Sequence, residues 1–248
     1  MGRWVLDAGA GPGRFTRRLG TGPAVRRVAL DISIEMLRRV VTSPGTGDTG
    51  ERPPERVLGD ARSLPFAPSA FDVVAAMGNL LGFAEGDSEV VLDRLIGAVA
   101  PGGTLLIEVA PGPGERSRYL RRLPPGSVAR LFRSAPTLVA GRVVREGFAR
   151  EPRRRAVAGE FRRLSVKELT RGLESRGMTV TEVLAVAPGL GADADRASSV
   201  AKDSKAWAHL LEVEERLGAD PERWEEAASI LLAAQRPEVP GAPASPAP

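Results

Sequence analysis

Cysteine is absent from the 248 residues, and His209 is the only histidine. Without cysteine there is no disulfide, no iron–sulfur cluster, no cysteine zinc site and no thiol nucleophile. A single histidine argues against histidine-rich metal sites and against most hydrolases that use a Ser-His-Asp triad. The sequence also lacks an apolar run of roughly 18 residues and the pattern of a secretory signal. We therefore expect a soluble, cytoplasmic protein.

Lysine is scarce as well, so the positive charge is nearly all arginine, and it is concentrated in one segment. The net charge is +4, yet residues 111–176 hold 17 Lys+Arg against 6 Asp+Glu. A basic segment can bind nucleic acid. However, Arg150–Arg155 has no interleaved aromatic residues on which bases could stack. The acidic stretch Glu212–Glu226 could instead neutralise this segment, within one molecule or across a homodimer.

The first 110 residues alternate apolar runs with amphipathic stretches. Runs that are apolar almost throughout are typical of strands covered on both faces, and five are found here, the third of them weaker: Trp4–Ala8, Arg27–Ile32, Arg56–Asp60, Phe71–Met77 and Thr104–Val109. Ile34–Val41 and Ser88–Val99 place apolar residues at helical spacing. This alternation predicts an α/β fold with a parallel sheet and right-handed crossovers.

The pattern changes after residue 110. We expect short helices at Arg118–Leu123 and Val128–Phe132, and a hairpin made of strands Thr137–Glu146 and Ala156–Leu164. We then expect a helix at Val166–Arg176, with a capping box formed by Ser165 and Glu168 and with Gly177 as the C-cap. A strand at Thr179–Val186, an amphipathic helix at Lys205–Leu217 and a strand at Ser229–Ala234 follow.

These expectations divide the chain into four parts. Residues 1–110 form a core, and residues 111–164 form an arginine-rich insertion that covers the substrate. Residues 165–236 return to the core, and the Pro/Ala-rich tail 237–248 is expected to be disordered. We expect His209 and Tyr119 to serve packing.

A glycine-rich turn follows the first strand. The run Val5–Thr16 reads VLDAGAGPGRFT, which predicts a strand, a turn and a helix start. Its G-x-G-x-G spacing differs from the G-x-G-x-x-G of dinucleotide-binding folds. Asp7, two residues before the first glycine, suits an ammonium group and would repel a pyrophosphate. Asp31 ends the second strand, where an acid can accept hydrogen bonds from ribose hydroxyls.

Five ordered motifs within residues 4–110 resemble those of class I S-adenosylmethionine-dependent methyltransferases. They are VLDAGAGPGRFT, ALDIS followed by Met36-Leu37, GDARSLPF, FDVVAAMGNLLGF and LIGAVAPGGTLLIEV. The resemblance implies a doubly wound seven-stranded sheet of order 3-2-1-4-5-7-6 with the last strand antiparallel. It also implies helices on both faces and an inserted cap between strands 5 and 6.

The resemblance also implies roles in binding S-adenosylmethionine, whose product is S-adenosylhomocysteine. The methionine end would lie on Asp7, Gly9, Ala10, Gly11 and Gly13, and the ribose on Asp31. The adenine would lie against Ile32 and Asp60, with Met36, Ala61 and Arg62 nearby. Residues beside the sulfonium would be Met77, Gly78, Asn79 and Leu80. The candidate catalytic residues are Asn79 and Glu108, and we expect no metal site.

Members of this family usually carry helices before the first motif, whereas here the motif begins at residue 4. We expect that the chain is a truncated reading frame or a minimal enzyme. Alternatively, the insertion or a partner subunit, which can be a second copy of the chain, supplies the lid over the site.

We predict methyl transfer to an N or O nucleophile of a small, anionic molecule. The alternatives are methylation of RNA or protein through the basic residues 111–176, and a non-catalytic binding subunit. A nicotinamide oxidoreductase is disfavoured because its fingerprint and its Tyr/Lys pair are both missing.

Overall fold

The computed structural model describes residues 2–20, 22–40, 52–110, 115–146, 148–150, 164–186, 194–221, 224, 227 and 229–238. The arginine run 151–155, most of the strand expected at 156–164 and the tail from residue 239 lie outside these residues. No helix among the described residues is long and apolar enough to cross a membrane.

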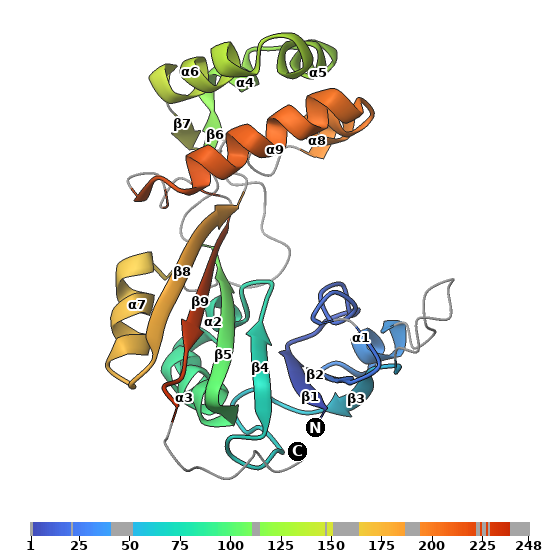
Figure 1. Cartoon of the computed structure of the whole chain (residues 1–248), viewed down its shortest axis with the longest axis vertical. Coiled ribbons are helices and arrows are strands. Elements are labelled where there is room, and N and C mark those ends of the chain that lie inside the picture. Colours follow the sequence, from blue (N-terminus) through green and yellow to red (C-terminus); the bar gives the residue numbers. More distant parts are fainter. Residues whose placement is uncertain are drawn as a thin grey trace.

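A seven-stranded sheet forms the centre of the molecule (Figure 1). Its order is β3-β2-β1-β4-β5-β9-β8, and only β9 runs antiparallel to its neighbours. This confirms the predicted order, with β8 and β9 as the sixth and seventh strands. The strands are β1 (Arg3–Ala8), β2 (Val25–Asp31), β3 (Glu55–Leu58), β4 (Phe71–Ala76), β5 (Val99–Val109), β8 (Thr179–Val186) and β9 (Ser229–Gln235).

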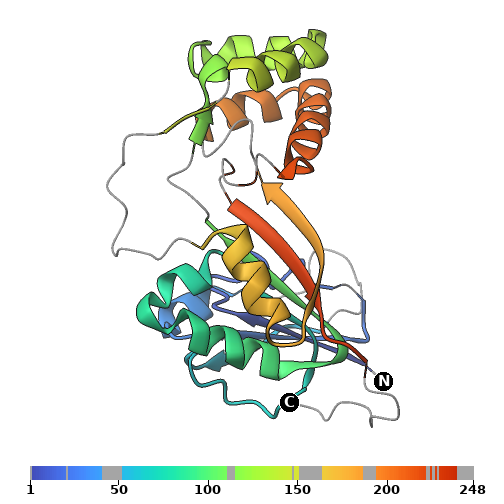
Figure 2. The same cartoon turned by 90° about the vertical axis from the view of Figure 1, so that its left-hand side faces the viewer.

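Helices cover both faces of the sheet, because apolar side chains point in both directions from its strands. On β2, Val28 and Leu30 belong to the main core, whereas Ala29 packs on the opposite face with Leu37. Helices α3 (Ser88–Ala98) and α7 (Val166–Glu174) lie together on the main-core face (Figure 2). Helix α1 (Ile34–Arg39) lies on the other face, and α7 carries the predicted Ser165–Glu168 capping box.

The segment after β1 differs from the prediction of a helix start. Residues 11–18 form successive turns, held by short-range bonds such as Gly13 N–H to the Ala10 carbonyl at 3.0 Å. Gly11, Pro12 and Gly13 lie at its beginning, and both glycines have positive φ. Such residues disfavour helical backbone. The glycine-rich turn therefore presents no helix N-terminus.

A helical cap lies beyond the carboxyl ends of the parallel strands (Figure 1). Its first part, which follows β5, contains β6 (Glu115–Ser117), α4 (Arg118–Arg121), α5 (Pro125–Ser134), α6 (Pro136–Glu146) and β7 (Phe148–Arg150). The strand expected at Thr137–Glu146 is therefore wrong. Its valines and threonine favour a strand, but Val139 and Ala140 are buried on one face of a helix. The antiparallel pair in this region is β6 with β7.

The second part of the cap follows β8 and contains α8 (Ala194–Ala201) and α9 (Ser204–Gly218). Both helices pack on α5 through an apolar cluster separate from the main core, which includes Val128, Phe132, Leu210 and Val213. His209 on α9 lies with its Nδ1 2.8 Å from the Phe132 carbonyl oxygen. This contact agrees with the packing role expected for His209.

Candidate functional site

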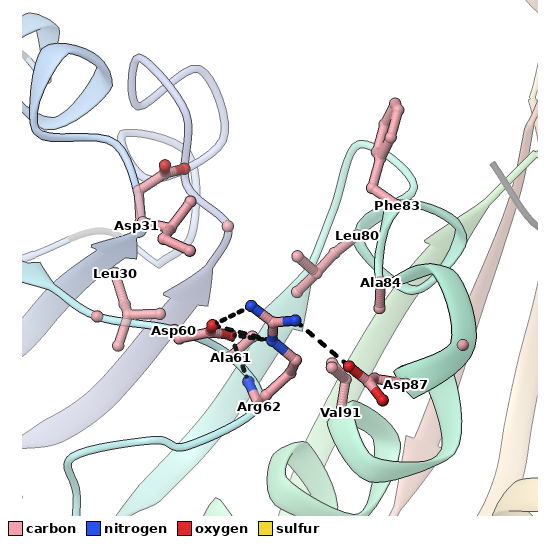
Figure 3. A pocket seen from close by; sticks show the side chains of 14 residues that line it. Leu30, Asp31, Asp60, Ala61, Arg62, Leu80, Phe83, Ala84, Asp87 and Val91 are labelled. Atoms are coloured by element: carbon pink, nitrogen blue, oxygen red, sulfur yellow. Dashed lines mark hydrogen bonds and ion pairs between the residues drawn. The ribbon is translucent and has the colours of Figure 1, made fainter. Parts of the chain in front are cut away.

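A cavity of about 420 Å³ opens at the carboxyl ends of β1, β2 and β3. Its opposite wall is formed by α2 (Leu80–Phe83), the 3₁₀ turn η1 (Glu85–Asp87) and the beginning of α3 (Figure 3). In α/β sheets, ligands bind at this edge. The lining residues are Gly9, Leu30, Asp31, Ile32, Gly59, Asp60, Ala61, Arg62, Leu80, Phe83, Ala84, Gly86, Asp87 and Val91.

Asp31 joins the end of β2 to the glycine-rich turn. One carboxylate oxygen accepts a hydrogen bond from Gly11 N–H at 2.7 Å, and the other accepts one from Ser33 N–H at 2.9 Å. An ionised carboxylate has about four acceptor positions, so Asp31 keeps capacity for a ligand. It lines the cavity, and its binding of ribose hydroxyls stays a prediction.

Gly9 and Gly13 allow the turn to pass close to its neighbours. A Cβ at Gly9 would lie 2.8 Å from Leu80 Cδ1, and one at Gly13 would lie 3.0 Å from Val40 Cγ1. Both residues also have positive φ, which other residues adopt only at a cost. Of these two, only Gly9 lines the cavity.

Asp7 lies behind the turn and does not line the cavity. Its side chain is buried, with 1% of the residue exposed, and its Oδ2 accepts a 2.5 Å hydrogen bond from the Thr16 hydroxyl. Its Oδ1 has no hydrogen-bond partner among the described residues. Burial disfavours the charged form and raises the pKa of Asp7 to about 6, although the Thr16 bond opposes this shift.

Asp60 and Arg62 form a tight pair on the cavity wall (Figure 3). Asp60 Oδ1 accepts from the Arg62 backbone N–H at 2.9 Å, and Oδ2 accepts from Nε at 2.9 Å and from Nη2 at 2.6 Å. These bonds lower the pKa of Asp60 and raise that of Arg62. The guanidinium also reaches Asp87, where Nη1 donates to Oδ2 at 3.3 Å.

Asn79 and Glu108 fix the turn after β4 to the end of β5. Glu108 Oε2 accepts from Gly78 N–H at 2.8 Å, and Asn79 Oδ1 accepts from Ala110 N–H at 3.1 Å. Asn79 has a φ of 64°, in the left-handed region. The two candidate catalytic residues therefore lie together, with their acceptor atoms directed at backbone rather than at the cavity lining.

Several other predicted residues do not line the cavity: Ala10, Gly11, Met36, Met77 and Gly78. The wall opposite β2 and β3 was not foreseen apart from Leu80. Phe83, Ala84, Gly86, Asp87 and Val91 complete it. No short sequence motif predicts these residues. The turns between α2 and α3 determine which of them face the cavity, and those turns were not predictable from a local pattern.

Comparison with known proteins agrees with this geometry. Residues 5–103 match the family model described as "Methyltransferase domain". A search among curated proteins finds no match.

Three solved structures illustrate the similarity of the fold. A methyltransferase from Mesorhizobium loti is 18% identical, with a TM-score of 0.53 over 95% of this chain and 91% of that chain. One from Methanosarcina mazei is 18% identical, with a TM-score of 0.52 over 96% and 94%. The [4+2]-cyclase SpnF is 15% identical, with a TM-score of 0.54 over 96% and 76%. At such identities the similarity concerns the fold alone.

The matched domain and the strand order point to one class of protein. Residues 5–103 match a methyltransferase domain, and the sheet has the strand order expected of the class I S-adenosylmethionine-dependent methyltransferase fold.

Proposed function

We propose that the chain binds S-adenosylmethionine in this cavity and transfers its methyl group to an N or O nucleophile of a small, anionic molecule. The observation that carries the proposal is the cavity itself. It combines two carboxylates, Asp31 and Asp60, with apolar surface from Ile32, Leu80 and Val91. Hydroxyl and amino groups of an adenosine need such acceptors, and its ring needs such a surface.

In this arrangement Asp31 accepts hydrogen bonds from the ribose hydroxyls. It also accepts a hydrogen bond from Gly11 N–H, which fixes the glycine-rich turn. Ile32 is 68% exposed and covers one side of the adenine. Asp60 accepts from the adenine amino group. Asp7 supports the turn from behind and supplies negative charge near the methionine ammonium group.

The cofactor supplies a methyl group already activated on a sulfonium. The chain therefore has to orient the acceptor and keep water out, and a base is needed only for a protonated nucleophile. The turn at Gly78 and Asn79 lies beside the methyl end. Glu108 is a positioning residue for this turn, because its carboxylate accepts a hydrogen bond from Gly78 N–H.

The arginine-rich segment 111–176, which contains the first part of the cap, supports an anionic acceptor. Residues 111–176 carry a net charge of +11 from 17 basic and 6 acidic residues. Exposed arginines in the described part of the cap are Arg122, Arg130, Arg133, Arg142 and Arg145. Arg133 is paired with Asp203 at 3.0 Å. Guanidinium groups bind carboxylates and phosphates in a bidentate way, so this cap favours acceptors that carry such groups.

The first test is calorimetric titration with S-adenosylhomocysteine, with NAD as the control ligand. We expect micromolar binding to the wild type and none to NAD. Asp31→Ala should weaken binding roughly 10- to 100-fold, because hydrogen bonds to a charged group are lost. Asp93→Asn, on α3 outside the cavity, should bind like the wild type. Absence of binding to the wild type would refute the proposal.

The second test concerns the acceptor. Methyl transfer is followed with pairs of acceptors that differ only in a carboxylate or a carboxamide group. The proposal expects the carboxylate to be preferred, with a kcat/KM that falls as salt rises. Equal rates for both members of every reactive pair would contradict an anionic acceptor.

A further inference from the structure

The Asp60–Arg62 pair raises a question for the proposed adenosine site. Both oxygens of Asp60 already accept hydrogen bonds from Arg62, including a contact of Nε with Oδ1 at 3.1 Å. An ionised carboxylate accepts about four hydrogen bonds. An adenine amino group can therefore bind Asp60 only if part of this interaction is given up.

Two features keep the free-energy cost of that exchange small. The Arg62 and Asp60 side chains are 50% and 33% exposed, and ion pairs in contact with water contribute little to stability. Asp87 offers a second acceptor on the same cavity wall, already 3.3 Å from Arg62 Nη1. Asp87 occupies the N-cap position of α3, yet its side chain makes no capping bond, so its carboxylate is available to a guanidinium.

We propose that Arg62 is an exchangeable partner of Asp60, which moves to Asp87 when the adenine amino group binds. This inference rests on the proposed function. In the structure Asp60 is paired with Arg62, and Arg62 links the loop after β3 to the start of α3. On binding, the amino group takes the place of Arg62 on Asp60, and the guanidinium pairs fully with Asp87. Asp87 then sets cofactor affinity through its pairing with Arg62.

The exchange predicts a specific pattern of S-adenosylhomocysteine affinities. Asp87→Asn removes the second acceptor, so Arg62 competes for Asp60 throughout, and binding should weaken about three- to fivefold. Arg62→Met removes the competitor, so binding should equal or exceed that of the wild type. In the Arg62→Met background, Asp87→Asn should have no effect. Asp93→Asn, which removes a charge from the same helix away from the cavity, is the matched control.

Purine riboside distinguishes the exchange from a general loosening of the wall, because it lacks the amino group that displaces Arg62. It should compete equally well for the wild type and for Asp87→Asn, whereas adenosine should compete less well for the variant. Three results would overturn the exchange: Asp87→Asn binding like the wild type, the same loss with and without Arg62, or weaker binding by Arg62→Met. No binding to the wild type would overturn both this inference and the proposed function.

Discussion

Asp7 combines a buried charge with one oxygen that has no hydrogen-bond partner among the described residues, and this combination destabilises the folded chain. Its pKa is about 6 in the folded protein, against an ordinary value of 3.8. Above pH 6 the carboxylate is ionised in both folded and unfolded chains, and the folded chain bears the full cost of the buried charge. As the pH falls from 6 toward 3.8, the folded chain binds the proton more tightly, so this cost disappears.

We therefore expect Asp7→Asn to raise the free energy of unfolding by about 1–3 kcal/mol above pH 6. The gain should shrink below pH 6 and vanish below about pH 4. The asparagine carbonyl can still accept the Thr16 bond. Urea unfolding at pH 4, 5, 6 and 7.5 measures the change. Thr16→Val, which removes that bond, should destabilise the protein instead. A variant no more stable than the wild type at pH 7.5 would contradict this account.

The individual residues of the site were predictable to the extent that a local pattern marks them. Asp31 ends β2 and Gly9 directly follows β1, and the strand ends of a parallel sheet meet at one edge. The partners of these residues were not predictable. Glu108 and Gly78 are 30 positions apart, and Arg62 and Asp87 are 25 apart. Only the register of β4 with β5, and the turns before α3, bring them together.

The turn after β4 gives a test of how two neighbouring elements are joined. Asn79 holds Ala110 N–H, and a Cβ at Gly82 would overlap the Asn79 side-chain amide. Gly82→Ala should therefore displace the Asn79 side chain, so that both Gly82→Ala and Asn79→Ala lose the hydrogen bond to Ala110 N–H.

Both substitutions should lower kcat roughly 10- to 100-fold, because a misplaced turn no longer orients the acceptor. Affinity for S-adenosylhomocysteine should change less than twofold. Single-turnover rates and calorimetry separate the two effects. Gly97→Ala on α3 is the matched control, because its Cβ would meet no atom within 4 Å. Unchanged kcat in Gly82→Ala would show that this turn plays no part in the reaction.

The strands of the sheet were easier to predict than the elements of the cap. Runs such as Val73–Ala76 are apolar because both faces of the sheet are covered. In α6, the β-branched residues favoured a strand in the sequence-based prediction. The segment is a helix instead, because Val139 and Ala140 pack in the cap cluster from one helix face. The segment after β1 shows the opposite case, since glycine and proline replaced an expected helix with turns.

The cap and the sheet have separate apolar clusters, so they should respond separately to a lost side chain. Phe132 is 1% exposed in the cap cluster, and Phe71 is fully buried in the main core. Either change to alanine removes about 3–5 kcal/mol of packing.

Phe132→Ala should speed amide exchange in α5 and α9 while β1 and β4 keep their protection. Phe71→Ala should instead reduce protection in the sheet. Hydrogen exchange followed by mass spectrometry measures both patterns. Equal loss of protection everywhere in Phe132→Ala would show that cap and sheet unfold as one unit.

The path of the chain through the cap has a consequence for how such proteins diversify. The chain leaves the sheet after β5, returns at α7, leaves again after β8 and returns at β9. Val128 on α5 and Leu210 on α9 share one cluster, although they come from different excursions. A new cap therefore cannot be acquired by exchanging one contiguous insert, because the two excursions must change together for their contact to survive.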